Sequence, residues 1–257
     1  MSGFVSLVGA GPGDPELLTV RGARRLAEAD LVLYDALVSP EMLDLAKRAH
    51  RFPVGKRAGR PSVAQETIHR LMIRGAARGR RIVRLKCGDP FVLGRGGEEA
   101  LALAAAGIPF EIVPGLTTAV TAPALAGIPV THRGLASGFV VVSGHAEAAY
   151  RPILEALAPN SLTLVILMGL AERGGLSRVL IARGWAGATP AAVCLAAGTP
   201  RAWTWFGTLA TLGAMAVSGD HGGTPGTIVI GEVVSVGAAL AAALSPRALS
   251  QAASQAG

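Results

Sequence analysis

The chain has 257 residues, of which 51% are hydrophobic, 16% charged and 4% aromatic, and its formal net charge is +7. This length fits one to two domains, and an apolar half with few charges excludes an intrinsically disordered chain. The 34 glycines follow no three-residue period, which excludes a collagen-like fibre.

Strand and helix signals alternate through the first half of the chain. Short apolar runs predict strands at residues 4–8, 31–34, 81–86 and 109–113. Amphipathic stretches predict helices at 16–29, from Gln65 to Gly79, and at 98–106. Ser62-x-x-Gln65 has the form of a capping box at the start of the second helix.

The alternation resumes after Gly134 and predicts strands at 139–143, 162–168, 191–196, 203–208 and 227–234, with helices at 150–157, 176–183 and 209–217. This rhythm is typical of α/β architecture with largely buried sheets. A Pro- and Gly-rich stretch at 114–138 suggests a domain junction, so we expect domains at 1–134 and 135–244. Residues 245–257 are mostly Ala, Ser and Gln and predict a disordered tail.

The mean hydropathy of +0.46 raises the question of a membrane span. The longest uncharged run, residues 112–132, is broken by three prolines, whereas a bilayer helix needs roughly 20 mostly apolar residues in regular helix. The N-terminal segment lacks the basic start and apolar stretch of a signal peptide. We therefore expect a soluble cytoplasmic protein that does not bind membranes.

The two cysteines, Cys87 and Cys194, are far apart and neither begins a C-x-x-C motif. Lone thiols in a cytosolic protein are most often small buried hydrophobic residues. The sequence therefore predicts neither a disulfide nor a metal site.

Positive charge is concentrated in the first half of the chain. Residues 47–86 hold 13 Lys and Arg against one acidic residue, Glu66. Such a patch attracts nucleic acid, anionic lipid or a small polyacid. The four-residue spacing of Arg70, Arg74 and Arg78 favours the plainer interpretation of a solvated helix face, but Lys56 and Arg57 fall in a loop that this does not explain.

The first motif is the glycine loop GAGPGD at residues 9–14, directly after a predicted strand. Glycines there let backbone amides approach an anionic ligand. The spacing is G-x-G-x-G, and Pro12 and Asp14 occupy positions where a dinucleotide-binding turn enters its helix. The loop is thus a weak sign of a ligand, and a plain dinucleotide-binding module is disfavoured.

The second motif runs from Arg84 to Glu99 and reads RLKCGDPFVLGRGGEE. A strand leads into a Gly-Asp-Pro turn, a glycine-rich loop with Arg95, and a helix that opens with Glu98 and Glu99. Acidic residues in a first turn suit the helix dipole, which is the structural explanation for both glutamates. Many glycines in a short loop lower stability, so a loop shaped around a ligand is favoured.

These motifs occur in one order with Tyr34-Asp35, GKR, VPGLTTA, AGIPVTHRG, Ser143-Gly144-His145, Met168-Gly169, Gly198-Thr199 and IGEVV. Together they resemble the S-adenosylmethionine-dependent uroporphyrinogen-III C-methyltransferases of the tetrapyrrole methylase superfamily, over about residues 3–236. The resemblance implies two α/β domains with the cofactor in the interdomain cleft, and usually a homodimer. It implies cofactor binding by Pro12, Cys87, Gly88, Asp89, Val92, Thr117, Thr118, Met168, Gly198, Pro225, Gly226 and Thr227.

The same resemblance implies the roles of the reacting residues. It assigns the base to Asp35 and the proton donor to Lys56, and it places Arg95 and Glu98 on the substrate side. Further substrate contacts fall on Arg57, Arg133 and His145. The chain departs from the family pattern at Cys87, where a second glycine is usual, at Leu167, where Tyr is frequent, and in the stretch after Gly198-Thr199.

The implied reaction methylates uroporphyrinogen III at two pyrrole carbons, C2 and C7, and gives precorrin-2. Attack by the pyrrole leaves a ring cation that must lose a proton, and a carboxylate such as Asp35 can accept it. Asp35 ends an apolar strand, and Ser39 is the better cap for the following helix. The substrate carries eight carboxylates, which need fixed cations such as Lys56, Arg57, Arg95 and Arg133. No metal is required.

Two other enzymes remain open alternatives. A methylase of a later corrin precursor shares the fold and donor, and the GRGGEE block argues against it. An RNA methylase would suit the basic segment at residues 47–86, but Phe52 is the single aromatic residue there, whereas base-stacking proteins usually show several. We expect a small tetrapyrrole substrate and no nucleic acid.

Overall fold

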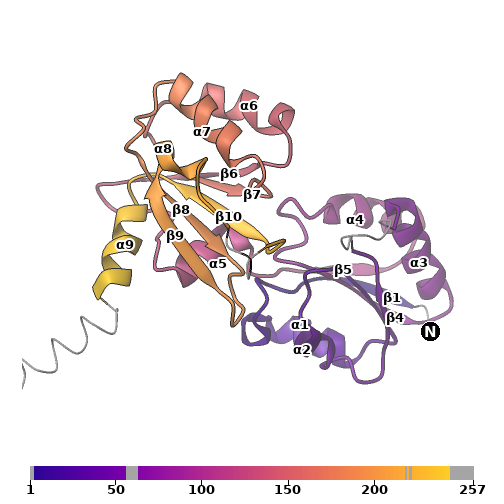
Figure 1. Cartoon of the computed structure of the whole chain (residues 1–257). Helices are drawn as coiled ribbons and strands as arrows, with labels where there is room; N and C mark the ends of the chain where they lie inside the picture. The colour runs from indigo at the N-terminus through magenta and orange to yellow at the C-terminus, as the bar shows by residue number, and fades with distance from the viewer. Residues whose placement is uncertain (1–2, 56–62, 218, 220–221, 244–257) are drawn as a thin grey trace, which may run out of the picture. The chain divides into compact units, whose positions relative to one another are not determined.

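The computed structural model describes residues 3–55, 63–217, 219 and 222–243 (Figure 1). The chain divides into two compact units, the first ending at Thr117 and the second beginning at Thr118. Two predicted site residues, Lys56 and Arg57, and the tail predicted at 245–257 lie outside the described residues. In the part of the chain that is described, no helix is both long and apolar enough to cross a bilayer.

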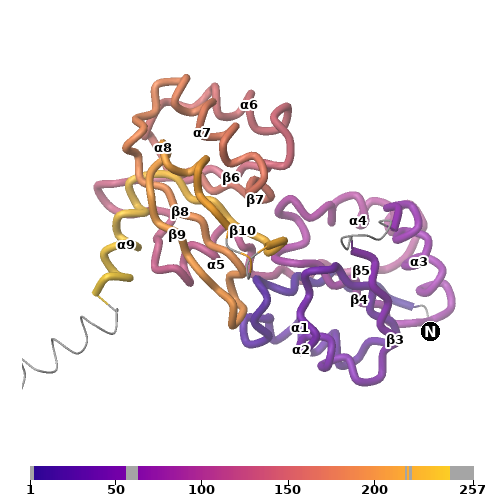
Figure 2. The backbone as a smooth tube through the Cα atoms, viewed as in Figure 1, coloured from indigo at the N-terminus to yellow at the C-terminus, as the bar shows by residue number. Residues whose placement is uncertain are grey.

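The first unit is built on a five-stranded parallel sheet with strand order β3-β2-β4-β1-β5. The smooth trace in Figure 2 shows β3 at the edge of this sheet. Its elements in chain order are β1 (Phe4–Gly9), the 3-10 helix η1 (Pro15–Leu17), α1 (Val20–Ala27), β2 (Leu31–Tyr34), α2 (Pro40–Leu43), β3 (His50–Pro53), α3 (Gln65–Ala77), β4 (Arg81–Lys86), α4 (Gly96–Ala105) and β5 (Phe110–Val113).

Helices cover both faces of the first sheet. Side chains alternate between the two faces along each strand, and each face carries apolar residues that need to be buried. On one face, α1 and α2 pack on Val8, Val32 and Val83. On the other, α3 and α4 pack on Leu7 and Leu33. Figure 1 shows the two helix pairs on opposite sides of the sheet. Because all its strands are parallel, their carboxyl ends lie together at one edge of the sheet.

The second unit contains a mixed five-stranded sheet with strand order β6-β7-β10-β8-β9, in which the neighbours β6 and β7 pair parallel and the other neighbouring strands pair antiparallel. Its elements are α5 (Thr118–Leu125), β6 (Phe139–Ser143), α6 (Glu147–Ala156), β7 (Thr163–Leu167), α7 (Arg173–Ala182), β8 (Pro190–Leu195), β9 (Trp203–Thr208), α8 (Leu209–Leu212), β10 (Gly226–Ile230) and α9 (Val234–Ala243). The α6–α8 group packs on one face, and α5 and α9 pack on the other.

The division between the units precedes α5, whereas the sequence analysis placed the domain boundary after residue 134. Ala122 of α5 and Ile128 pack with Ala192 and Val229 of the second sheet, so the Pro-rich stretch belongs to the second unit. Burial of these side chains on that sheet outweighs the compositional break that suggested a later boundary.

Most predicted elements are confirmed, with local differences. The limits of β2, β4, β6 and β9 match the predictions, and Arg70, Arg74 and Arg78 are exposed on α3 and the residue that ends it. The predicted helix 16–29 is split into η1 and α1, because the Thr19 hydroxyl caps a new helix start. Helix α3 begins at Gln65 behind Ala64, and Ser62 of the expected capping box lies outside the described residues.

Candidate active site

The first sheet has a topological switch point between its neighbouring strands β1 and β4. From β1 the chain passes through α1 on one face of the sheet, and from β4 it passes through α4 on the other face. In parallel α/β sheets, ligands bind beyond the carboxyl ends of the strands at such a point. The residues that follow β1 and β4 are therefore the first place to look for a site.

Both glycine loops meet there. Gly11 and Gly88 form an isolated antiparallel bridge, in which Gly88 N donates to Gly11 O at 2.8 Å and Gly11 N donates to Gly88 O at 3.1 Å. Both glycines have left-handed φ angles, +73° and +64°, which L side chains rarely adopt. The bridge places Pro12 close to Gly88, two residues that the sequence analysis assigned to the cofactor.

Asp89 ties the loop after β4 to the loop after β5. Its carboxylate accepts hydrogen bonds from Phe91 N at 2.8 Å and from Gly115 N at 3.1 Å. Val92 is half-buried in the first of these loops, and Thr117 follows in the second. The structure thus gathers the predicted cofactor residues of the first unit at the carboxyl edge of its sheet.

The GRGGEE loop presents an ion pair at the surface. Arg95 Nη2 lies 2.7 Å from Glu98 Oε2, and the two side chains are 59% and 52% exposed. Leu93 and Arg95 hold left-handed φ angles of 52° and 58°, a strain that functional loops often carry. The hydrogen bond from Arg95 lowers the pKa of Glu98. Both charged groups face solvent, where a substrate could reach them.

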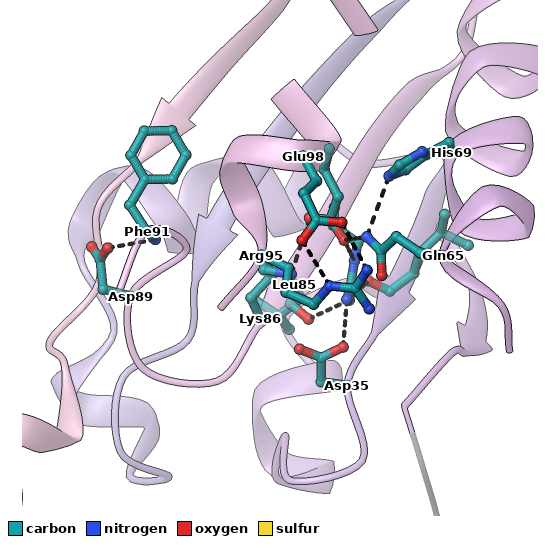
Figure 3. Close-up of polar contacts among 12 residues, drawn as sticks. Asp35, Gln65, His69, Leu85, Lys86, Asp89, Phe91, Arg95 and Glu98 are labelled. Atoms are coloured by element: carbon teal, nitrogen blue, oxygen red, sulfur yellow. Dashed lines mark hydrogen bonds and ion pairs between the residues drawn. The ribbon is translucent and has the colours of Figure 1, made fainter. Parts of the chain in front are cut away.

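Asp35 follows β2 at the same edge and contacts a buried cluster of charges. Arg84 Nη2 donates to Asp35 Oδ1 at 2.5 Å, and Arg84 Nε donates to Glu99 Oε1 at 2.9 Å. Lys86 Nζ lies 3.0 Å from Glu99 Oε2. Figure 3 shows Asp35, Lys86 and Gln65 converging on this cluster. The Asp35 side chain is 27% exposed, whereas the other three charged side chains are at most 4% exposed.

Sequence reasoning missed Arg84, Lys86 and Glu99 as a unit. The available signal was the alternation of two basic residues along a strand with otherwise apolar neighbours, because that spacing puts both on one buried face. The assignment of the helix cap to Ser39 is confirmed, since its hydroxyl accepts from Met42 N at 3.4 Å. The Asp35 side chain is therefore not needed as the helix cap.

Burial and charge act on the two basic groups in different directions. Burial lowers the pKa of Arg84, but the carboxylates of Asp35 and Glu99 outweigh it and the net shift is upward. The pKa of Lys86 is lowered, first by burial and then by the charge of Arg84, against the attraction of Glu99. Arg84 is thus the permanent cation that holds Asp35.

The thiol of Cys87 packs on the α1–α2 face of the first sheet, beside the cluster that contains Val38 and Met42. The main-chain amide of Leu37 donates to it. Burial, and then the negative charge of Asp35, raises the pKa of Cys87 to about 12. Cys87 stands where the family usually has a glycine, and its partly buried side chain packs against the apolar residues on this face of the sheet.

We expect Cys87 to react very slowly with Ellman's reagent in the native protein. A pKa of about 12 leaves about one thiolate in ten thousand at pH 8, and the thiolate is the reacting form. A Cys194→Ala variant isolates the signal, because burial also raises the pKa of Cys194, to about 11. The guanidine-unfolded variant should react at once, and equally fast labelling of the folded variant would contradict the prediction.

The second unit gathers another set of predicted residues at one edge of its sheet. Thr227 pairs with Leu167 and with Cys194 across the strands, and Ala196 N donates to Pro225 O at 3.0 Å. Residues that follow or begin these strands therefore lie together, and they include Met168, Gly198, Pro225, Gly226 and Thr227. Met168 has a left-handed φ of 59° and is 54% exposed.

Three other predicted residues have separate placements. His145 follows β6, and the hydroxyl oxygen of Ser143 lies 2.8 Å from His145 Nδ1. Ser143 itself is in register with Leu167 on the neighbouring strand β7. Arg133 is exposed in a turn between α5 and β6. Thr118 begins α5. The structure brings His145 toward the edge with Met168, but it does not join Arg133 to that edge.

These features define a two-unit α/β protein with glycine loops at a switch point and a carboxylate, Asp35, at the same edge of the first sheet. The sequence matches the tetrapyrrole (corrin/porphyrin) methylases over residues 5–213. The chain belongs to this family, and its two α/β sheets confirm the predicted fold class.

Two relatives are similar over most of this chain. Uroporphyrinogen-III C-methyltransferase of Methanocaldococcus jannaschii is 45% identical over 239 residues, which cover 92% of this chain and 98% of the relative. Siroheme synthase 1 of Yersinia enterocolitica is 51% identical over 236 residues, which cover 91% of this chain and 49% of that protein. The chain thus spans about half the length of the siroheme synthases that it matches.

Solved structures show the same fold. Uroporphyrin-III C-methyl transferase from Thermus thermophilus, complexed with S-adenyl homocysteine, has a TM-score of 0.76 at 42% identity, covering 90% of this chain and 99% of that one. Cobalt precorrin-4 methyltransferase has a TM-score of 0.79 at 28% identity, covering 90% and 95%. The fold is therefore shared between two methyltransferases that are named for different substrates, and the sequence identity is higher to the uroporphyrin-III enzyme.

Proposed function

We propose that this chain transfers methyl groups from S-adenosylmethionine to C2 and C7 of uroporphyrinogen III and forms precorrin-2. The observation that carries this proposal is the 45% identity to a uroporphyrinogen-III C-methyltransferase of which the chain covers 98%. The position of Asp35 supports it, because a carboxylate at the carboxyl edge of the parallel sheet can face a bound substrate.

The loops after β1, β4 and β5 fit a donor with a nucleoside and a charged tail. Gly9, Gly88 and Gly115 approach so closely that a Cβ on Gly115 would lie 2.3 Å from Gly88 O. Backbone groups there can approach a ligand without interference from side chains. We assign the donor to the predicted residues at this edge and at the Met168 edge of the second sheet. When bound, the donor supplies an electrophilic methyl group on its sulfonium sulfur.

Asp35 serves the acceptor side of the reaction. Methylation of a pyrrole carbon leaves a cationic ring that must lose a proton. Arg84 holds one oxygen of Asp35, and among the described residues the other oxygen has no hydrogen-bond partner. Asp35 can therefore stabilise the ring cation and accept the proton at Oδ2. Lys56, the proton donor implied by the family resemblance, lies outside the described residues.

Exposed cations suit a substrate with eight carboxylates. Arg95 and Arg133 are both exposed, and guanidinium groups bind carboxylates in bidentate fashion. We propose these two arginines, with Arg57, Glu98 and His145, as the substrate-binding residues. The family resemblance also supports a cytoplasmic location and a homodimer. Light scattering coupled to gel filtration would test the homodimer, because it measures the molar mass in solution.

Labelled methyl transfer tests the function. Purified protein is mixed with methyl-labelled S-adenosylmethionine and, in separate reactions, uroporphyrinogen III, a later corrin precursor, or RNA. We expect two labels per uroporphyrinogen III and none in RNA. Stronger labelling of the corrin precursor would replace the proposed substrate, and labelled RNA would support the alternative suggested by the basic segment at residues 47–86.

A further inference from the structure

Glu99 is a buried carboxylate at the start of α4 that meets donors from two other elements. Its Oε1 accepts from Arg84 Nε at 2.9 Å and from Gln65 Nε2 at 3.1 Å, and its Oε2 lies 3.0 Å from Lys86 Nζ. The side chain has no solvent exposure, whereas the adjacent Glu98 side chain is 52% exposed. The two neighbouring glutamates therefore have different roles.

We infer that Glu99 is a positioning residue that acts through Arg84 to fix the Asp35 carboxylate for proton acceptance. The inference rests on the proposed function, in which Asp35 faces the substrate. Among the described residues, Glu99 forms its hydrogen bonds and ion pairs with Arg84, Gln65 and Lys86 and not with Asp35, so its effect on Asp35 is indirect.

The hydrogen bonds of Arg84 show how this positioning works. Nε is occupied by Glu99, and Nη1 donates to Leu33 O at 3.4 Å and to Leu85 O at 3.2 Å. Only Nη2 remains for Asp35, and it contacts Oδ1 alone. Because a guanidinium is planar and rigid, fixing Nε and Nη1 fixes the direction from which Nη2 approaches. Asp35 is consequently held by one oxygen, and Oδ2 stays available.

Loss of the Glu99 charge would change this arrangement. The cluster contains two basic groups, Arg84 and Lys86, and two carboxylates, Asp35 and Glu99. Without the Glu99 charge, Asp35 becomes the one carboxylate of the cluster, and the hydrogen bond that holds Arg84 Nε is weaker, because a neutral acceptor replaces a charged one. The guanidinium can then turn and bind both oxygens of Asp35, which is its preferred geometry with a carboxylate. That would draw Oδ2 away from the substrate.

Stability alone is a weak reason for such a cluster. Buried ion pairs lose much of their Coulombic attraction to desolvation, and apolar side chains of similar volume often stabilise a protein as well or better. Because the buried members of the cluster include the partner of Asp35, Arg84, the cluster is placed to orient the Asp35 carboxylate.

A double-mutant cycle tests the inference in the full chain. Glu99→Gln should lower kcat by about 10- to 100-fold, the range expected when a reacting group is misplaced by about 1 Å. Calorimetric titration with S-adenosylhomocysteine counts the sites that bind donor, and kcat is expressed per such site. Because Glu99 acts through Asp35, adding Glu99→Gln to Asp35→Asn should lower kcat by less than threefold beyond the single Asp35 variant.

The matched control is Glu111→Gln. Glu111 lies on β5, away from the cluster, and the substitution removes its ion pair with Arg25 of α1. It should keep the wild-type kcat per donor site. If Glu99→Gln does not fold, the same cycle is run with Glu99→Asp, which keeps the charge but shortens the side chain by one carbon. Fully additive losses in kcat, or a wild-type kcat per donor site in the Glu99 variant, would overturn the inference. Failure of the proposed function looks different, since the wild type would then bind S-adenosylhomocysteine but methylate no uroporphyrinogen III.

Discussion

The substitution Asp35→Asn should lower kcat by about 10²-fold or more, the range typical of a lost general base. Asparagine keeps the shape of the side chain and one acceptor for Arg84 Nη2, but it carries no charge for the ring cation and cannot take the proton. The dissociation constant of S-adenosylhomocysteine should stay within about threefold of the wild-type value, because Asp35 belongs to the acceptor side. Steady-state kinetics and calorimetric titration measure the two quantities.

The structure adds an effect of this substitution on stability. Asp35 shares the buried guanidinium of Arg84 with Glu99, so removal of its charge weakens one hydrogen bond to a charged group. We expect the free energy of unfolding to fall by about 1–3 kcal/mol. Asp44→Asn is the control, because Asp44 forms an exposed pair with Arg51 in the same unit. An Asp35→Asn variant with kcat within a few-fold of wild type would eliminate Asp35 as the base.

Local sequence patterns predicted every strand of the described residues except β3, whose four residues are all exposed and form no apolar run. The limits of β4 and β6 follow from short apolar runs bounded by glycine or polar residues. Two helices were not predicted. A proline at position 123 argues against a helix at α5, and only the three residues Gly231, Glu232 and Val233 separate the apolar run of β10 from α9. Both helices are specified by packing on the second sheet, which a local pattern does not report.

The site shows the same division between local and long-range information. Glycine spacing identified the loops that meet at Gly11 and Gly88, because left-handed backbone restricts the residue type. The alternation of Arg84 and Lys86 along β4 is a local signal of the buried cluster, but its carboxylates carry none, since Arg84 meets Asp35 and Glu99 only after three elements have packed together. The sequence alone therefore places Arg84 and Lys86 in the basic segment at residues 47–86. It gives Glu99 no role beyond the helix dipole, whereas the family resemblance assigns Glu98 to the substrate side.

Close contact between main chains at the switch point makes Gly115 a restrictive position in the loops of the first unit. A Cβ there would lie 2.3 Å from Gly88 O and 2.6 Å from Gly9 Cα. A Cβ on Gly9 would meet Gly115 Cα at 2.6 Å in the same way. All these neighbours are backbone atoms, so no side-chain rotation relieves the overlap and the loops themselves must move apart.

Gly115→Ala should therefore lower the free energy of unfolding by about 2–4 kcal/mol, as overpacking of a tight site does. Separation of the loops would also lengthen the hydrogen bond from Gly115 N to Asp89 and move Gly88, so we expect affinity for S-adenosylhomocysteine to fall at least tenfold. Gly138→Ala is the control, because a Cβ at Gly138 meets no atom within 4 Å. It should change the free energy of unfolding by less than about 0.5 kcal/mol and leave the affinity unaltered. Chemical unfolding and calorimetry measure both variants, and wild-type affinity in a folded Gly115→Ala protein would show that the donor does not depend on these loops.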